Sequence, residues 1–267
     1  MSEYQLRFGG IARLYGQSGA NIIQQAHFCV IGIGGVGSWV AEALARSGIG
    51  EITLIDLDDI CITNINRQIH ALSTTVGESK VEVMAERIRQ INPECKINCI
   101  EDFVTQDNLF ELMSKGYDYV IDAIDSVKIK TALIAYCKRN KLPIITIGGA
   151  GGQTDPSKIQ LCDLSKTFQD PLLAKVKNQL RREFNFPKAD AKNQSKRKFS
   201  IDAVFSTEQL MYPNADGEVC HAKQTQNGTM RLDCSGGFGA ATHVTASFAF
   251  LAVSKAIKKL INKKLKE

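Results

Sequence analysis

Three glycines and one acid are the residues whose types and spacing first point to chemistry. Gly32, Gly34 and Gly37 form a G-x-G-x-x-G pattern after an apolar run, and Asp56 ends the next apolar run, nineteen residues after Gly37. Backbone N–H groups of such a turn, at a helix start, can hold phosphate, and an acid at the second strand end can accept hydrogen bonds from ribose hydroxyls. The pattern predicts a nucleotide site but fits a dinucleotide and ATP equally well.

Two cations further along the chain separate these alternatives. Arg67 lies in TNINRQ (63–68), just past the strand that ends at Asp56, and Lys80 opens the next helix. Both are expected on the ligand side of the sheet, where they would neutralise a triphosphate and its pyrophosphate leaving group. A dehydrogenase needs an open nicotinamide pocket with a proton donor instead, and no residue here points to one. The two cations therefore favour ATP.

The stretch VIDAIDSVKIK (120–130) supplies two carboxylates at the end of another apolar run, Asp122 and Asp125. Carboxylates in this position can hold Mg²⁺, which needs few protein ligands when it also binds phosphates. Asp122 is equally well explained as a helix N-cap or a turn acid. Asp125 is the residue that we predict to bind the metal.

The elements that must position these residues alternate between strand and helix up to about residue 150. Strands are predicted at 27–33, 52–55, 97–100, 119–121 and 144–147, and helices at 38–46, 80–91, 105–113 and 126–139. This alternation predicts an α/β fold with a doubly wound, Rossmann-like, mostly parallel sheet. Ligands of such sheets bind at the carboxyl ends of the strands, which would bring the glycines, Asp56 and residues 122–126 together.

The sequence GGAGGQTDPSK (148–158) interrupts the alternation. We predict an ATP-binding domain over residues 1–155 and a smaller C-terminal α+β extension over 156–267. The extension should contain a strand at 159–163, an amphipathic basic helix at about 171–184, a polar and mobile insertion at about 185–200, and a helical end from Phe238 onward.

Composition narrows the class of protein. The chain has 267 residues, of which 44% are hydrophobic and 23% charged, as is usual for a globular protein. Its net charge of +5 is concentrated: nine Lys or Arg stand against two acids between Lys175 and Lys198, and six lysines against one acid from Lys255 onward. Such clusters indicate either an anionic partner or a solvated face.

Cysteine usage and hydropathy bear on the cellular compartment. The eight cysteines form no C-x-x-C pair, so a four-thiolate zinc site is not supported, and free thiols in a reducing cytoplasm are expected. The first ten residues contain no apolar run of the kind found in secretory signals. Residues 236–254 carry no Asp, Glu, Lys or Arg, but their Thr, Ser, Gly and His243 favour a buried helix over a membrane span.

Five ordered motifs, GIGGVGSWVAEALARSGIGEITLIDLDDI, TNINRQ, GESKVE, INP and DAIDS, make residues 5–155 resemble the ThiF/MoeB/ubiquitin-activating-enzyme superfamily. These enzymes adenylate carboxylates with ATP. The resemblance implies metal coordination at Asp125 and a catalytic arginine near the N-terminus, often supplied by the partner subunit of a homodimer, for which Arg13 is the candidate. It implies a nucleotide site made of Gly32, Gly34, Gly35, Gly37, Asp56, Thr63, Asn64, Asn66, Arg67, Lys80, Asp125 and Ser126.

The second half of the chain narrows the resemblance from the superfamily to one family within it. It lacks the paired C-x-x-C zinc motifs of the sulfur-carrier and molybdopterin enzymes, and it has the basic insertion and RLDCSGGFGAATHVTASFAFLAVSKAIKK (231–259). Over its whole length the chain is similar to the tRNA threonylcarbamoyladenosine dehydratase family. That resemblance implies that ATP, with Mg²⁺, activates the threonine carboxylate beside the tRNA anticodon. An internal oxygen then displaces AMP and closes a ring, with net loss of water.

The same resemblance implies the partners. The basic residues 175–198 and the lysine-rich tail would bind the tRNA phosphates, with a strong salt dependence and no role for DNA. A cysteine desulfurase or sulfur-acceptor protein is also implied as a partner.

Other assignments stay open. Cys234 could be a nucleophile or a packing residue, since an internal ring closure needs no protein thiol. The chain could instead adenylate a sulfur-carrier or ubiquitin-like protein, with Cys234 or Cys162 as the acceptor. A non-catalytic tRNA-binding module would have no reason to keep Arg67, Lys80 and Asp125 together.

Overall fold

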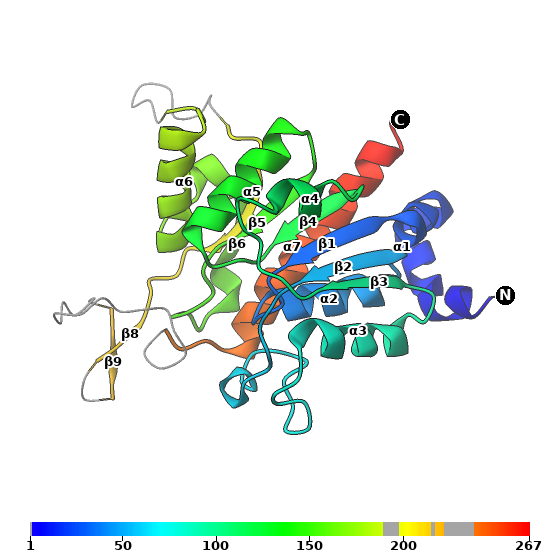
Figure 1. Cartoon of the computed structure of the whole chain (residues 1–267), viewed down its shortest axis with the longest axis horizontal. Helices are drawn as coiled ribbons and strands as arrows, with labels where there is room; N and C mark the ends of the chain where they lie inside the picture. Colours follow the sequence, from blue (N-terminus) through cyan, green and yellow to red (C-terminus); the bar gives the residue numbers. More distant parts are fainter. Residues whose placement is uncertain (1, 189–197, 215–216, 222–237) are drawn as a thin grey trace.

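The computed structural model describes residues 2–188, 198–214, 217–221 and 238–267. Seven strands form one sheet in the order β3-β2-β1-β4-β5-β7-β6, and every neighbouring pair is parallel except β6 and β7 (Figure 1). The strands are β1 (His27–Ile31), β2 (Glu51–Ile55), β3 (Lys96–Ile100), β4 (Tyr119–Asp122), β5 (Ile144–Ile147), β6 (Ile159–Asp163) and β7 (Asp202–Ser206). A separate hairpin pairs β8 (Tyr212–Pro213) with β9 (Val219–Cys220).

Helices cover both faces of this sheet. Along β1, Phe28 and Val30 lie in one apolar cluster, whereas Cys29 and Ile31 lie in the other. Because successive strand residues point to opposite faces, a sheet covered on both sides needs continuous apolar runs, which is what the strands contain. One face is covered by α1 (Glu3–Gln25), α2 (Gly37–Arg46), α3 (Lys80–Ile91) and α7 (Thr242–Lys264), and the other by α4 (Leu109–Met113), α5 (Val127–Arg139) and α6 (Pro171–Glu183).

The order in which the chain adds strands to the sheet changes side once, at β1. From β1 the chain proceeds outward to β2 and β3, and then returns to β4 on the other side of β1. Helices leaving β1 and β4 therefore lie on opposite faces, and the carboxyl ends of these two strands are where such folds bind ligands. We call this the carboxyl edge of the sheet, and the opposite one the amino edge.

The predicted α/β doubly wound fold is confirmed, with some boundaries moved. The first strand ends at Ile31 because Gly32, with φ of 84°, turns the chain away. The predicted helix at 105–113 begins only at Leu109, and the C-terminal helix begins at Thr242. The sequence did not indicate α1, a 23-residue helix that begins with a capping box at Ser2 and contains a kink at Gly16.

The two predicted parts of the chain share one sheet. Strands β6 and β7 continue it beyond β5, and α7 packs against α2. The division at residue 155 stays a prediction. Residues 189–197 of the basic insertion lie outside the described residues, but Phe186 and Phe199 on either side are buried, with ring centroids 4.9 Å apart.

The uncharged stretch that ends at Ser254 lies mainly in α7. Val244, Phe248 and Ala252 of this helix are fully buried in the apolar core, so the predicted buried helix is confirmed from Thr242 onward. Over the described ranges, no helix combines the length and apolar character that crossing a bilayer requires.

Candidate active site

The glycine turn (residues 32–37) lies at the carboxyl edge, between β1 and α2. The Gly32 amide donates to the Ile55 carbonyl of β2 at 2.9 Å, and its positive φ suits glycine. A Cβ added at Gly37 would lie 1.7 Å from the Gly32 carbonyl oxygen, whereas one at Gly34 would meet only Gln68 Nε2, at 3.9 Å. The turn therefore closes tightly because Gly37 has no side chain. It brings the N-terminus of α2 to the carboxyl edge, where a helix N-terminus can bind phosphate.

Replacing Gly37 by alanine is expected to destabilise the protein by about 3 kcal/mol or more and to abolish ATP binding, because the turn must open. Gly34→Ala is the matched control for stability, since its new methyl group has space within the protein. Urea denaturation of both variants and ATP titration of Gly37→Ala measure the two effects. Equal denaturation midpoints for the two variants would contradict this account of the turn.

Ile33, the second residue of the glycine turn, is hydrogen-bonded through both its amide and its carbonyl group. Its amide donates to Asp56 Oδ2 at 2.6 Å, and its carbonyl accepts from His70 Nε2 at 2.9 Å. Burial lowers the pKa of His70 to about 4, so this ring is neutral near pH 7. Burial also raises the pKa of Asp56, opposed by Lys80 and by the amides of Asp58 and Ile33. Asp56 thus ends β2 beside the glycine turn with lone pairs left for a further donor.

The two predicted cations lie at the same edge. The Arg67 side chain lies over Gly35, where an added Cβ would be 3.3 Å from Arg67 Cδ, and its Nη1 donates to the Thr63 carbonyl at 2.8 Å. Lys80 is buried, and its Nζ lies 2.7 Å from Asp58 Oδ2. The sequence left the role of Asp58 open, and its pairing with Lys80 was missed. Its position two residues after Asp56 was the only signal available.

The segment from Thr63 to Asn66 is organised by its own side chains. The buried Asn64 accepts from the Cys61 amide through Oδ1 at 3.0 Å, and Thr63 Oγ1 donates to Cys61 Sγ. Asn66 Nδ2 donates to the Ala240 carbonyl at 2.8 Å. These three residues shape the loop that carries Arg67, and Asn66 also ties it to the chain just before α7.

That chain, residues 238–241, crosses the carboxyl edge. Ala240 is bound by Asn66 on the side of β2, and the neighbouring Gly239 carbonyl accepts from the Gly152 amide at 2.7 Å on the side of β5. Phe238 packs against Gly151 and Gly152, where an added Cβ would lie 2.8 Å from its ring or Cβ. The extension therefore closes over the edge at which the nucleotide residues gather.

The two aspartates after β4 have different environments. Asp122 is fully buried, where it accepts from the Ile124 amide at 3.1 Å and the Thr146 hydroxyl at 2.7 Å, and it pairs with Lys130 at 3.0 Å. The turn-acid interpretation of Asp122 is confirmed, and its oxygens are occupied. Asp125 is exposed, and Ser126 occupies the N-cap position of α5 without a side-chain capping bond.

The donor set at this edge fits Mg²⁺ rather than a protein-caged metal. Within the described ranges, no three His, Cys, Asp or Glu side chains come close enough to hold an ion by themselves. Mg²⁺ commonly takes one or two carboxylates and completes its shell with phosphate oxygens and water. A single exposed carboxylate, Asp125, beside a phosphate-binding turn meets that requirement.

Arg13 is not brought to this edge within the single chain, and Cys234 is outside the part of the chain that the structure describes. Arg13 lies on α1 with its guanidinium over Gly9 and Gly10. Arg7, the other N-terminal arginine, donates to the Gln90 and Ile91 carbonyls at the end of α3.

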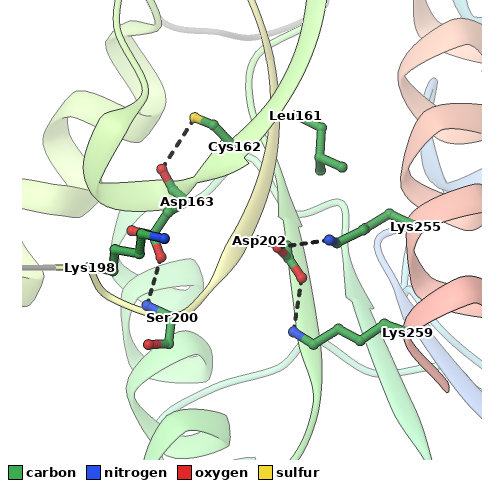
Figure 2. Close-up of a pocket in the computed structure, with 8 residues that line it drawn as sticks. All are labelled: Leu161, Cys162, Asp163, Lys198, Ser200, Asp202, Lys255 and Lys259. Carbon is green, nitrogen blue, oxygen red and sulfur yellow. Dashed lines mark hydrogen bonds and ion pairs between the residues drawn. The ribbon is translucent and has the colours of Figure 1, made fainter. Parts of the chain in front are cut away.

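Cys162 is at the wrong edge to receive a group activated at the glycine turn. It pairs in register with Ala203, one residue after Asp202 at the start of β7, so it lies near the amino edge. It lines a pocket of about 420 Å³. Figure 2 shows it across this pocket from Lys255 and Lys259, both of which pair with Asp202. Burial raises the pKa of this thiol, which disfavours a nucleophilic thiolate.

Comparison with known proteins identifies one matching family model and several similar proteins. The ThiF family model matches residues 9–267. The tRNA threonylcarbamoyladenosine dehydratase of Escherichia coli is 61% identical over 97% of this chain and 95% of its own length. The crystal structure of the E. coli enzyme in complex with ATP matches all of this chain and 98% of its own, with 55% identity and a TM-score of 0.87. The molybdopterin-synthase adenylyltransferase of Salmonella typhimurium is 32% identical over 51% of this chain and 54% of its own length.

Proposed function

Since the chain belongs to the ThiF family and, within it, to the tRNA threonylcarbamoyladenosine dehydratases, we propose that it uses ATP to dehydrate threonylcarbamoyladenosine beside the tRNA anticodon. The observation that carries the proposal is that three parts of the chain meet around the glycine turn. Arg67 lies over Gly35, and the Asp125 loop (residues 123–126) borders Gly32. Lys80 pairs with Asp58, two residues after the Asp56 that binds the Ile33 amide. A glycine turn alone would suit many nucleotides. Two cations and a free carboxylate beside it suit the transfer of an adenylyl group from a triphosphate.

The proposed reaction has two steps. An oxygen of the threonine carboxylate attacks the α-phosphorus of ATP, the bond to the β-phosphate breaks, and pyrophosphate leaves. An oxygen within the same modified nucleoside then attacks the activated carbonyl carbon, a proton is lost, and AMP departs with the carboxylate oxygen that attacked first. The enzyme has mainly to position the reactants and to stabilise developing charge, and Arg67 and Lys80 are the residues that we assign to the charge.

Asp125 is the residue that we assign to Mg²⁺, with Ser126 beside it. The ion would neutralise charge on the phosphates, and Asp125 would orient it relative to the glycine turn. Asp56 would bind the ribose, since it lies at the end of β2 next to Ile33.

A homodimer is part of the proposal. Arg13 has no contact with the nucleotide residues of its own chain, and an arginine on α1 could reach the site of a partner subunit instead. If so, mixing an Arg13→Ala protein with an inactive Lys80→Met protein should restore activity in the mixed dimer. No recovery on mixing would remove Arg13 from the site.

The basic segment (residues 175–198) is the surface that we assign to tRNA. Lys175, Lys188 and Lys198 are exposed there, whereas Arg181 is engaged with the Phe199 ring at 5.3 Å. Phosphate contacts made by such residues release counterions, so their contribution falls steeply with salt.

Neutralising Lys196, Arg197 and Lys198 together is expected to weaken tRNA binding by about tenfold or more at moderate salt and to lower the salt slope by about two, with ATP binding intact. Lys196 and Arg197 lie outside the described residues. The control is a variant of equal charge change at the other end of the sheet, in which Arg89, Lys96 and Lys115 become glutamine. Filter binding over a salt series measures both. Unchanged tRNA affinity at low and moderate salt would contradict the assignment.

Mass spectrometry of nucleosides from cells that lack this protein tests the function as a whole. Their tRNA should contain threonylcarbamoyladenosine that retains its water, and the purified protein with ATP should remove it in vitro. A normal dehydrated nucleoside in such cells would contradict the proposal. Pyrophosphate exchange driven by a carrier-protein C-terminus, with no effect of tRNA, would favour the sulfur-carrier alternative.

A further inference from the structure

A buried ion pair lies directly behind the loop that carries Asp125. The side chains of Lys130, on the second turn of α5, and Asp122, at the end of β4, are both fully buried, and Nζ lies 3.0 Å from Oδ2. Burying two charges costs several kcal/mol for each ion, which pairing offsets only when the remaining donors and acceptors are satisfied. A pair of apolar residues would stabilise such a site as well or better, so the pair invites a functional explanation.

All three protons of the ammonium group have acceptors. Besides the Asp122 carboxylate, Lys130 Nζ donates to the Ile124 carbonyl at 2.8 Å and to the Asp122 carbonyl at 3.3 Å. The other carboxylate oxygen of Asp122 accepts from the Ile124 amide. Ile124, the residue immediately before Asp125, is therefore held at both its N–H and its C=O by the two members of one ion pair.

The backbone of residues 123 and 124, next to this ion pair, also borders the glycine turn. The Ala123 amide donates to the Ile31 carbonyl at 2.9 Å, and a Cβ at Gly32 would lie 2.9 Å from the Ala123 carbonyl oxygen. The peptide units on both sides of Ala123 are thus in contact with the entry to the glycine turn. A shift of Ile124 would move Asp125 relative to that turn.

The charge of Lys130 also affects Asp170, the carboxylate that binds the loop after β5. Asp170 accepts from the Gly149 amide at 3.0 Å and from the Leu173 amide at 2.9 Å. Burial raises the pKa of Asp170, and the charge of Lys130 opposes this rise. Lys130 therefore supports the ionised state of a second carboxylate, which anchors the loop that meets Gly239.

We propose that Lys130 is a positioning residue for adenylation: by binding the Ile124 carbonyl, it sets the distance between Asp125 and the glycine turn. The proposal rests on the function proposed above, and Lys130 itself does not touch the nucleotide. A pair that served stability alone could satisfy its remaining protons on acceptors anywhere in the core, whereas both of these acceptors lie on the backbone that leads to Asp125.

The test uses the full-length protein and a variant that avoids leaving a buried charge unpaired. In Asp122→Asn/Lys130→Met both charges are removed, and the asparagine Oδ1 can still accept from the Ile124 amide. The carbonyls of Ile124 and of residue 122 lose the Lys130 donor. Leu133→Ala, which truncates a fully buried side chain of the same helix, is the control for loss of stability.

Two measurements separate positioning from stability. Pyrophosphate release with substrate tRNA should fall by about 100-fold in kcat for the double variant, with the ATP KM changed less than about threefold. Amide hydrogen exchange, without nucleotide or metal, should accelerate by about tenfold over residues 123–126 relative to the rest of α5. Leu133→Ala should show neither change once activity is expressed per folded protein.

A double variant with normal kcat, or with exchange no faster at 123–126 than elsewhere, would overturn the proposal. Wild-type protein that releases no pyrophosphate with substrate tRNA would count against the proposed function instead. Amide exchange would then still decide whether Lys130 holds the Asp125 loop.

Discussion

Asp125→Ala is expected to reduce AMP formation by about 1,000-fold or more while the protein stays folded. Asp125 is exposed and makes no contact in the apolar core, so its removal leaves no cavity and no unpaired buried group. The expected loss follows from the proposed role of Asp125, because without this carboxylate the proposed Mg²⁺ would lose the protein ligand that orients it. Single-turnover AMP release from ATP and substrate tRNA, with circular dichroism for folding, measures the effect.

The control for this variant is Asp107→Ala, which removes an exposed carboxylate from the segment between β3 and α4. It should behave as the wild type. Normal AMP release from a folded Asp125→Ala protein would remove Asp125 from the site.

Lys80→Met is expected to lower kcat/KM for ATP by about 100-fold or more. The buried Lys80 is held 2.7 Å from Asp58, whose side chain is 56% exposed, so its ammonium group is fixed before ATP arrives. Methionine fills a similar space without the charge, and the exposed Asp58 can be solvated by water. The substitution should therefore affect the reaction far more than stability.

Asp58→Asn and Lys96→Met provide the comparisons. Asp58→Asn should lower kcat/KM much less than Lys80→Met does. It removes only the carboxylate that holds the ammonium group and leaves the positive charge of Lys80 in place. Lys96→Met removes an exposed lysine at the amino edge and should leave kcat/KM unchanged. Steady-state pyrophosphate release measures all three, and equal losses for Lys80→Met and Lys96→Met would contradict the assignment of Lys80.

Much of the fold follows from local patterns. The sequences of β1, β2, β4 and β5 are mostly apolar because these strands are buried, whereas the edge strand β3 is only half-buried and contains Asn98. Lys80 begins α3 at the position that the pattern predicts. The glycine spacing and Asp56 are local too, since the turn and the strand that follows its helix occur in every fold of this kind.

What the patterns could not predict depends on contacts between distant parts of the chain. Asp58 and Lys80 are 22 residues apart, and the role of Asp122 depends on Lys130 and on Thr146 of the neighbouring strand. Likewise, nothing local shows that β6 and β7 join the first sheet, or that this pairing places Cys162 at the amino edge. The helix α1 was missed because its first half contains glycines and charges that a periodicity search discounts.

The central claim is that the threonine carboxylate is adenylated, and an isotope experiment tests it most directly. Substrate tRNA carrying threonylcarbamoyladenosine with an ¹⁸O-labelled carboxylate is incubated with the protein and unlabelled ATP, and the AMP is analysed by mass spectrometry. Adenylation followed by ring closure predicts one ¹⁸O in each AMP, since the carboxylate oxygen that attacked phosphorus leaves with it. AMP without label, or label in inorganic phosphate beside ADP, would contradict the account.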